Sequence, residues 1–374
     1  MSQLPMRAVI DLGAIRSNTA ELLRRADGAA VMAVVKARGY GHGAVPCART
    51  AQQAGATWVG VAQLDEALQV RRDGIGGRLM SWIYTPQAPF DQAIEADIDL
   101  GVSSRWALEA IAQAARQAGR KARAHLKIDT GMGRAGIPPR EWTETVDQAL
   151  GLGDAIDLVG CWSHLACADV PDHPSVRAQK DMFAWAVGAA ELAGARFEVR
   201  HLANSAALLT DAGANWDMVR PGLAMYGLSP IPDLASAREL NLRPAMRLES
   251  ALALVKHVEA GQGVSYGLTY RTDRATTLGV VGAGYSDGVP RHASNRAPVQ
   301  VGAHRRRIAG RVCMDQFVVD LGPHAADAAG DKVVLFGSGD DGEPTAQDWA
   351  EAAETIVYEV VCRIGAHIPR VYVG

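Results

Sequence analysis

Residues 29–55, AAVMAVVKARGYGHGAVPCARTAQQAG, combine a short apolar run, a glycine-rich turn and an alanine-rich segment. The apolar run over 29–36 predicts a buried strand, and the segment over 45–55 predicts a helix that ends at a glycine. A strand followed directly by a helix is the repeating unit of α/β folds. Lys36 ends the strand, so its ammonium must reach either solvent, as an ordinary turn residue, or a cleft, where it could take part in chemistry.

The same alternation of apolar runs and helical segments continues to about residue 225. Helical periodicity is clear over 64–74, 104–119 and 178–194. Eight apolar runs in this part predict strands at 29–36, 58–62, 78–83, 98–102, 121–129, 156–164, 197–203 and 216–222. Eight strands, each followed by a helix, predict an N-terminal (β/α)8 barrel of the TIM type.

The pattern changes after the barrel segment. Residues 230–250 are typical of a linker, and the strand-like runs that follow are separated by turns with little helical period. A chain of 374 residues also exceeds what one compact domain usually holds. We therefore expect a barrel over residues 1–240 and a mainly β domain over 241–374, to which the first few residues could add a strand.

Composition excludes several classes of protein. A formal net charge of -3 with 21% charged and 48% hydrophobic residues lacks the basic excess of nucleic-acid-binding proteins. The sequence opens without a signal peptide pattern, and no apolar run approaches the roughly 18 to 20 residues of a membrane span. The five cysteines are irregularly spaced without a C-x-x-C pair, which predicts neither disulfides nor a metal site. We expect a cytoplasmic protein with no nucleic-acid or membrane partner.

Polar residues gather where the predicted strands end. In a barrel of this type, the chemistry lies at the C-terminal ends of the strands. The polar residues expected there are Lys36, Tyr40, Lys127, Asp129, Arg134, His164, His201, Asn204, Ser205 and Arg220. Taken singly, each has a plainer interpretation, such as a solvated turn lysine, a structural histidine or an arginine bridging a surface carboxylate. Because five polar clusters fall at one end of one predicted barrel, we expect a functional site.

The residue types point to pyridoxal 5′-phosphate (PLP). Lys36 could hold this cofactor as a Schiff base, and Ser205 with the glycines of the last two turns could hold its phosphate. Arg220 is the candidate partner of the ring nitrogen. Because an arginine can only donate, it would keep that nitrogen unprotonated and make the cofactor a weaker electron sink. A weak sink suits a reaction whose carbanion is promptly reprotonated.

Eight motifs resemble, in order, those of the bacterial alanine racemases, and the resemblance covers essentially the whole chain. They are AVVKARGYGHG (33–43), KIDTGMGRAG (127–136), HLANSAAL (201–208), VRPGLAMYG (219–227), VSYGLTY (264–270), GYSDGVPR (284–291), GRVCMDQ (310–316) and TIVYEVVCRI (355–364). Arg38 and Gly39 depart from the family's more usual asparagine and alanine, and the C-terminal GAHIPRVYV is looser than the usual ending. The resemblance implies a PLP-dependent isomerase of fold type III that supplies D-alanine for peptidoglycan as a homodimer.

The resemblance also implies a role for individual residues. Lys36 matches the base on the D face of the substrate, and Tyr266 of the partner subunit matches the base on the L face. Lys127 matches a lysine that the family often carries as a carbamate. The implied cofactor contacts are Lys36, Tyr40, His164, Asn204, Ser205, Arg220, Gly222, Leu223 and Tyr358. The implied substrate contacts are Arg134, Met314 and Asp315. The substrate entrance would be lined by Asp169, Tyr285, Arg291 and Arg311.

Three alternatives remain at the level of sequence. A PLP-dependent decarboxylase shares the architecture, but that family typically places an acidic residue where Arg220 stands here. A non-catalytic PLP carrier of the barrel type would need neither the second domain nor Tyr266. A racemase of serine or another small amino acid cannot be separated from an alanine racemase, because the volume of the substrate pocket depends on tertiary structure.

Overall fold

Eight parallel strands form a single sheet in the computed structural model, which describes residues 6–170 and 172–374. In sheet order they are β8 (Val199–His201), β7 (Ile156–Trp162), β6 (Ala122–Lys127), β5 (Asp99–Val102), β4 (Arg78–Ser81), β3 (Trp58–Gly60), β2 (Ala30–Val34) and β9 (Met218–Val219). The two end strands, β8 and β9, are joined just beyond their ends by the parallel bridge Asn204–Arg220, which nearly closes a barrel. The eight predicted strands and the barrel are therefore confirmed, although each strand is shorter than its apolar run.

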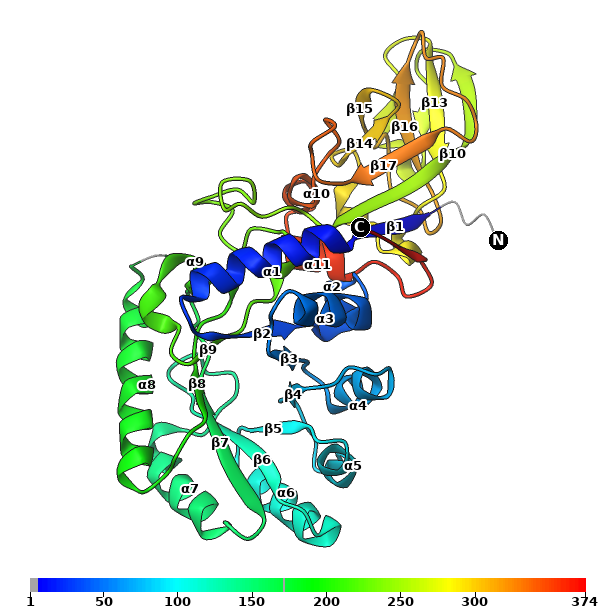
Figure 1. Ribbon diagram of the computed structural model, residues 1–374. Coiled ribbons are helices and arrows are strands. Elements are labelled where there is room, and N and C mark those ends of the chain that lie inside the picture. Colours follow the sequence, from blue (N-terminus) through cyan, green and yellow to red (C-terminus); the bar gives the residue numbers. More distant parts are fainter. Residues whose placement is uncertain (1–5, 171) are drawn as a thin grey trace. The chain divides into compact units, whose positions relative to one another are not determined.

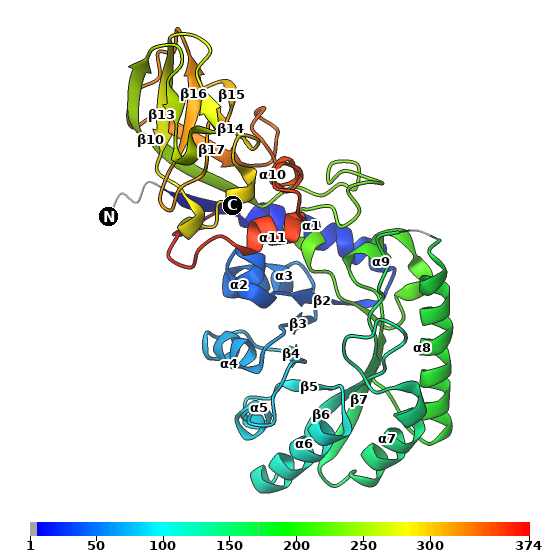
Figure 2. The ribbon, with the colours of Figure 1, turned by 180° about the vertical axis from the view of Figure 1, so that it is seen from behind.

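Helices cover the outside of this sheet (Figures 1 and 2). They are α1 (Leu12–Ala26), α3 (Ala44–Gln53), α4 (Leu64–Arg72), α5 (Phe90–Glu95), α6 (Arg105–Ala118), α7 (Pro139–Gly151), α8 (Pro174–Leu192) and α9 (Ser205–Thr210). The four helices expected from periodicity correspond to α3, α4, α6 and α8. None of the helices in the described part of the chain has both the length and the apolar character that a membrane span requires.

The interior of the barrel is filled by aromatic side chains as well as aliphatic ones. Trp82 and Trp162 meet edge to face with ring centroids 6.0 Å apart. The ring of Trp58 meets the ring of His125 in the same way at 5.4 Å. The buried rings of Trp58 and Trp162 restrict the motion of the polar side chains beside them, because a buried ring in contact with its neighbours on several sides has little freedom to move.

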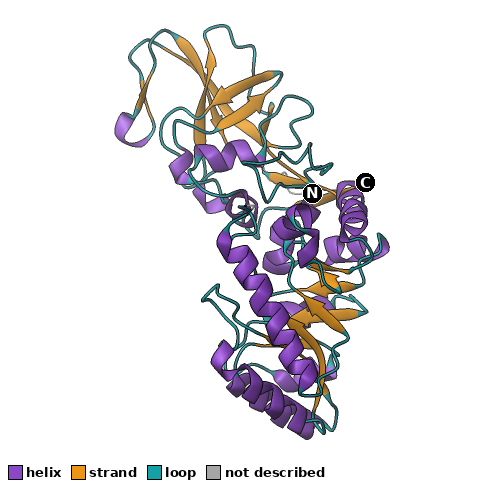
Figure 3. Ribbon diagram, turned by 90° about the vertical axis from the view of Figure 1, so that its left-hand side faces the viewer, coloured by secondary structure: helices purple, strands orange, loops and turns teal. Residues whose placement is uncertain are grey.

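A second sheet belongs to a separate unit, made of the described residues up to Ala14, Tyr40–Gly43 and Arg243–Gly374. We call it the β unit, and the rest of the chain, Ile15–Gly39 with Ala44–Leu242, the barrel unit. The β unit is mostly strand and loop (Figure 3), as expected. Its sheet contains β1 (Arg7–Asp11), β10 (Met246–Val258), β13 (Thr276–Val281), β14 (Pro298–Val301), β15 (His304–Arg307), β16 (Phe317–Gly322), β17 (Lys332–Phe336) and β18 (Arg370–Val373).

The N-terminal strand is an interior strand of this second sheet, next to its edge strand β18. β1 pairs antiparallel with β10 on one side and parallel with β18, the last strand of the chain, on the other. Both ends of the described chain are therefore held in the β unit. Its buried residues include Leu248, Phe317 and Phe336, and the Phe336 ring contacts Trp349 of α10 (Ala346–Ala352).

Candidate functional site

Lys36 directly follows β2, where the backbone turns in the left-handed sense through α2 (Lys36–Tyr40). The positive φ angles are 51° at Ala37, 56° at Arg38, 63° at Gly39 and 50° at Tyr40. Left-handed backbone costs about 1 to 2 kcal/mol for each residue with a β-carbon, so tertiary contacts must hold it. One such contact is the Glu66 carboxylate, which accepts the Ala37 N–H at 2.7 Å. Strain of this kind concentrates at functional sites, and here it lets Lys36 leave the sheet.

Arg220 is held from several directions at the closing edge of the barrel. Its Nη2 donates to the carbonyl oxygens of Ser163 at 2.7 Å and Leu202 at 3.2 Å, and lies 3.3 Å from His164 Nδ1. Its Nη1 lies 3.1 Å from His201 Nδ1. Among the residues described, none accepts a hydrogen bond from its Nε. The guanidinium is thus fixed in place through Nη1 and Nη2, and its Nε–H remains for a ligand.

Cationic side chains surround His164 at the mouth of the barrel. The pKa of His164 lies well below its usual value, because the ring is buried and because Arg220, Arg134, Lys127 and Lys36 all lie near it. His164 is therefore neutral at physiological pH. Since Arg220 can only donate, His164 Nδ1 accepts and its proton lies on Nε2. Four cationic side chains near one another, of which Lys127 and Arg220 are buried, favour an anionic ligand.

Lys127 ends β6 inside the same group. Burial, Arg220 and Arg134 lower its pKa to about 8, against the opposing effect of Asp129. Its Nζ lies 4.5 Å from the centre of the Trp162 ring. Asp129 is occupied elsewhere, because its Oδ1 accepts three backbone N–H groups of the following turn at 3.0 to 3.1 Å. The amine of Lys127 therefore has an unusually large neutral fraction near pH 7 to 8.

The turns after β8 and β9 are joined by the hydroxyl of Ser205. Its Oγ accepts the backbone N–H of Gly222 at 2.8 Å and that of Ala224 at 3.4 Å. Asn204 caps α9, since its side-chain oxygen accepts the Ala207 N–H at 3.0 Å. Leu223 follows Gly222 and is fully buried. These are the two turns in which barrels commonly hold a phosphate group.

Two predicted cofactor residues meet in the β unit. The rings of Tyr40 and Tyr358 lie 6.2 Å apart, with Tyr358 on α11 (Val357–Cys362). Burial raises the pKa of Tyr40, as do Tyr358 and Cys362 beside it. The Tyr40 hydroxyl is therefore protonated and can donate a hydrogen bond to an anion.

Tyr266 stands on a strained loop of the β unit and is 72% exposed. The loop has positive φ angles of 61° at Ser265 and 49° at Leu268. The Ser265 hydroxyl donates to the carbonyl oxygen of Arg311 at 2.6 Å, which fixes the base of the loop. The strain is thus held by a specific contact, and the loop presents the phenol of Tyr266 to the outside of the unit.

The remaining predicted residues of the β unit lie near this loop. The Met314 carbonyl oxygen accepts hydrogen bonds from the Ser286 N–H and hydroxyl at 3.0 and 2.9 Å. The same hydroxyl lies 3.1 Å from Asp315 Oδ1. The backbone N–H of Tyr285 donates to the carbonyl oxygen of Cys313, the residue before Met314, at 3.0 Å. Arg291 of the β unit and Asp169 of the barrel unit are both exposed.

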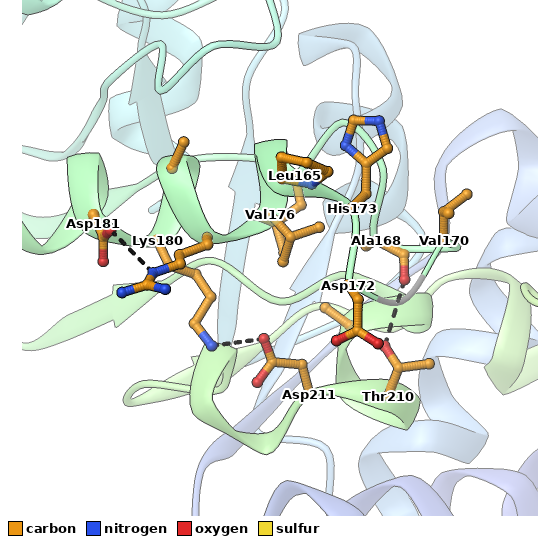
Figure 4. A pocket seen from close by; sticks show the side chains of 14 residues that line it. Leu165, Ala168, Val170, Asp172, His173, Val176, Lys180, Asp181, Thr210 and Asp211 are labelled. Carbon is orange, nitrogen blue, oxygen red and sulfur yellow. Dashed lines mark hydrogen bonds and ion pairs between the residues drawn. The ribbon is translucent and has the colours of Figure 1, made fainter.

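A cavity of about 850 Å³ in the barrel unit lies apart from these residues, beside α8 and α9 (Figure 4). None of the predicted site residues lines it. Four of its charged side chains form two ion pairs, Lys180–Asp211 at 2.7 Å and Arg177–Asp181 at 4.0 Å. The cavity therefore offers no group of reactive side chains comparable with the barrel mouth.

Sequence reasoning missed His125 and Trp162 and gave no role to His201. All three are buried in the barrel close to Arg220 or Lys127. A signal for His125 was present, because it lies two residues before Lys127 and alternate residues of a strand face the same side. Trp162 resembled an ordinary core residue, and nothing local distinguished it.

Two family models match the chain in succession. The model "Alanine racemase, N-terminal domain" matches residues 10–230, and "Alanine racemase, C-terminal domain" matches residues 245–372. The alanine racemase of Beutenbergia cavernae is 57% identical over 372 residues, which are 99% of this chain and 98% of that protein. The structure of alanine racemase from D-cycloserine-producing Streptomyces lavendulae has a TM-score of 0.98 and 54% identity, covering 100% of this chain and 98% of its own. The structure of alanine racemase from Streptomyces coelicolor A3(2) has a TM-score of 0.98 and 52% identity. The match covers 100% of this chain and 99% of that one.

The fold and these relatives together define an amino-acid racemase, an isomerase built from a barrel and a β unit. Within that class, the chain belongs to the alanine racemase family, because both family models match it in order and close relatives cover nearly all of it. The resemblance inferred from the eight sequence motifs is confirmed.

Proposed function

We propose that this chain interconverts L-alanine and D-alanine with two bases, Lys36 and Tyr266, that act on opposite faces of the substrate's α-carbon. Racemisation of alanine is the activity of the family, and the assignment of the two bases is ours. The observation that carries the proposal is the environment of Arg220. Its guanidinium is held by neutral acceptors and keeps its Nε–H for a ligand. Burial lowers the pKa of Arg220 to about 9, so it remains a cationic donor at neutral pH.

The residues at the barrel mouth fit PLP. The four cations around His164 favour an anionic ligand, and the Ser205 turn brings backbone N–H groups together where a phosphate can bind. We assign Lys36 to the covalent attachment and Arg220 to the ring nitrogen. The phosphate contacts would be Tyr40, Ser205, Gly222, Leu223 and Tyr358, with Asn204 beside them. His164, whose Nδ1 lies 3.3 Å from Arg220 Nη2, would link Arg220 to the tyrosine base.

When bound, the cofactor supplies an electron-withdrawing ring that stabilises negative charge on the α-carbon of the substrate. Arg220 donates to the ring nitrogen and cannot give up a proton to it readily, which keeps the withdrawal weak. Racemisation would need one of the two bases to take the α-proton from one face and the other, protonated base to deliver a proton to the opposite face. Lys36 exchanges the proton on the D face, and Tyr266 exchanges it on the L face.

Groups from both units would hold the substrate. Arg134 and the backbone N–H of Met314 are suited to the substrate carboxylate, with Asp315 beside them. A carbamate on Lys127 would place a negative charge near Arg134 and orient it. The lowered pKa of Lys127 supports this, because only a neutral amine reacts with carbon dioxide. Asp169, Tyr285, Arg291 and Arg311 would line the entrance, and alanine's small side chain sets the size of substrate expected.

The proposal includes a homodimer in which Tyr266 acts in the site of the second copy. Support comes from large apolar side chains that the β unit leaves exposed near the base. Tyr266 is 72% exposed, Met314 54%, Leu268 50% and Tyr285 40%. Exposed aromatic and apolar groups gathered around a strained loop are typical of an interaction surface.

Borohydride reduction tests the cofactor assignment. The purified protein with PLP should racemise L-alanine, and reduction should fix a pyridoxyl group on the peptide that contains Lys36. Lys36→Ala should abolish both the label and the activity, whereas Lys121→Ala, at an exposed lysine of the same unit, should retain both. Mass spectrometry of the peptides locates the label. A label on another lysine would contradict the assignment.

Hydrogen exchange tests the assignment of the two faces. Tyr266→Phe removes only the phenol hydroxyl and should slow exchange of the α-proton of L-alanine in deuterium oxide by at least about 100-fold. Exchange of D-alanine by the same variant is the internal control and should fall far less, because Lys36 removes and returns that proton. Both rates can be followed by proton NMR, and equal losses would refute the assignment.

A further inference from the structure

A line of hydrogen-bonding side chains crosses the inside of the barrel and ends at Arg220. Asp99 Oδ2 lies 3.2 Å from His125 Nε2, and His125 Nδ1 lies 3.1 Å from His201 Nε2. His201 Nδ1 in turn lies 3.1 Å from Arg220 Nη1. Asp99, His125 and His201 are fully buried, and Arg220 is 6% exposed. Four strands or strand ends thus contribute one polar group each to a single continuous line.

The direction of every hydrogen bond in this line follows from Arg220. A guanidinium can only donate, so His201 Nδ1 accepts and the single proton of neutral His201 must lie on Nε2. That Nε2–H donates to His125 Nδ1, so the proton of His125 must lie on its Nε2 and points to Asp99. The reverse direction would leave His201 with no proton on either nitrogen. Burial and Arg220 lower the pKa of His201 and keep it neutral.

The carboxylate end of the line is fixed by two arginines. Arg78 Nη2 donates to Asp99 Oδ2 at 2.7 Å, and Arg123 Nε donates to Asp99 Oδ1 at 2.6 Å. Burial of Asp99 opposes ionisation, but its contacts with His125, Arg78 and Arg123 outweigh burial and lower its pKa. Asp99 is therefore an anion and serves only as an acceptor.

The two imidazole rings are held in their orientations by the barrel interior. The Trp162 ring stacks on His201 at 5.6 Å with an angle of 6° between the planes, and Trp58 meets His125 edge to face. Position 160 must be glycine, because a β-carbon there would lie 2.0 Å from His125 Nδ1. No metal explains the cluster, since the described residues contain no group of His, Cys, Asp or Glu arranged to hold one.

We propose that Asp99, His125 and His201 are positioning residues that fix the orientation and donor role of Arg220 through this one-directional line. The inference rests on the proposed function only in taking Arg220 as the partner of the cofactor ring. His201 Nδ1 accepts a hydrogen bond from Nη1 of Arg220, and backbone carbonyl oxygens, including that of Ser163, accept from Nη2. With Nη1 and Nη2 held in this way, the Nε–H is the donor that we assign to the cofactor ring.

The positions of the two protons can be measured directly. In holoenzyme labelled with nitrogen-15 at histidine, two-bond proton–nitrogen correlation spectra distinguish the two neutral forms of imidazole from the cation. His125 and His201 should both be neutral at pH 7 with the proton on Nε2, and each signal can be assigned by its loss in His125→Gln or His201→Gln. A cationic ring, or a proton on Nδ1 of either residue, would overturn the proposal.

A pair of variants tests the effect on Arg220. His201→Asn keeps an oxygen that can accept from Nη1, whereas His201→Leu removes the acceptor and leaves a buried N–H without a partner. PLP should be lost from the diluted His201→Leu holoenzyme at least about tenfold faster than from wild type, and from His201→Asn at a rate close to wild type. His257→Asn, at an exposed histidine of β10, is the control.

The outcomes separate this inference from the proposed function. If wild type holds PLP on Lys36 and His201→Leu loses it no faster than His201→Asn, the line is overturned and the proposed function stands. If wild type binds no PLP, the proposed function fails, while the proton positions in the NMR spectra still test the line itself. Should His201→Leu not fold, the spectra of wild type and the behaviour of His201→Asn decide the question.

Discussion

Lys127 shows how a buried position changes the chemistry of one residue. Burial and two neighbouring arginines lower the pKa of Lys127 to about 8, from about 10.4 in an unfolded chain. Between these two pH values, the unfolded chain binds a proton that the folded chain has lost. The contribution of Lys127 to the free energy of unfolding therefore rises with pH across this window and falls as the pH drops through 8. The same shift makes the amine nucleophilic near neutral pH.

Carbamylation of Lys127 should follow that pKa. At constant dissolved carbon dioxide, a carbamate signal in carbon-13 NMR should be weak at pH 6, where roughly one amine in a hundred is neutral, and strong at pH 8, where about half are. The signal should be absent from Lys127→Met. A spectrum of Lys127→Met that matches wild type would show that another amine reacts.

At the level of elements, the turn after β2 passes close to helix α11. A β-carbon on Gly41 would lie 2.2 Å from the carbonyl oxygen of Val361, near the C-terminal end of that helix. Gly41 also has a φ angle of 82°, which favours glycine. The helix carries Tyr358, whose ring contacts Tyr40. The close approach of two backbones thus brings together the two tyrosines that we assign to the phosphate.

Gly41→Ala should therefore be strongly destabilising. We expect the free energy of unfolding to fall by more than about 2 kcal/mol, because both the backbone angle and the contact with α11 become unfavourable. Gly28→Ala is the matched control: its φ angle is 91° but nothing lies within 4 Å of the added carbon. Gly28→Ala should cost only about 1 kcal/mol. Urea unfolding compares the two, and equal losses would contradict a steric role for Gly41.

At the level of the whole molecule, the residues assigned to the site come from two units, each with its own sheet and core. Lys36, Arg134, His164 and Arg220 belong to the barrel unit. Tyr266 and Met314 belong to the β unit and are exposed. A base with 72% of its surface exposed needs a second surface to exclude water from it, and a second copy of the chain is the occupant that we propose.

Mixing two inactive variants tests that arrangement. Lys36→Ala and Tyr266→Phe each lack one base, and a mixed dimer with shared sites contains one intact pair. An equal mixture after full subunit exchange should recover up to about a quarter of wild-type activity, since half the dimers are mixed and each has one working site. Native mass spectrometry verifies the exchange. No recovery in a sample that contains mixed dimers would exclude a shared site.

Much of the barrel could be predicted from the sequence, and less of the site. The apolar runs located all eight barrel strands, because the strands are short, buried and bounded by turns. All of them but β5 end earlier than expected, as does β2, which ends at Val34 and not at Lys36. The reason is the left-handed turn, which no propensity of Ala37 or Arg38 predicts. His125 was overlooked although it lies two residues before Lys127 on the same side of β6, because its partner His201 comes from a strand far along the chain.

The sequence by itself determined the barrel and the mainly β second part, and it located the lysine, arginine and tyrosine residues of the predicted site. These features could be predicted because strand periodicity, helical periodicity and motif spacing are local properties. Tertiary structure decided which of these groups meet. His125 and His201 are 76 residues apart in the chain, yet their nitrogens lie 3.1 Å apart inside the barrel. Such a contact depends on the register of neighbouring strands and on the missing side chain at Gly160. Tertiary structure also decided the direction of the hydrogen bonds between Asp99 and Arg220, because only a complete set of donors and acceptors fixes where each proton lies.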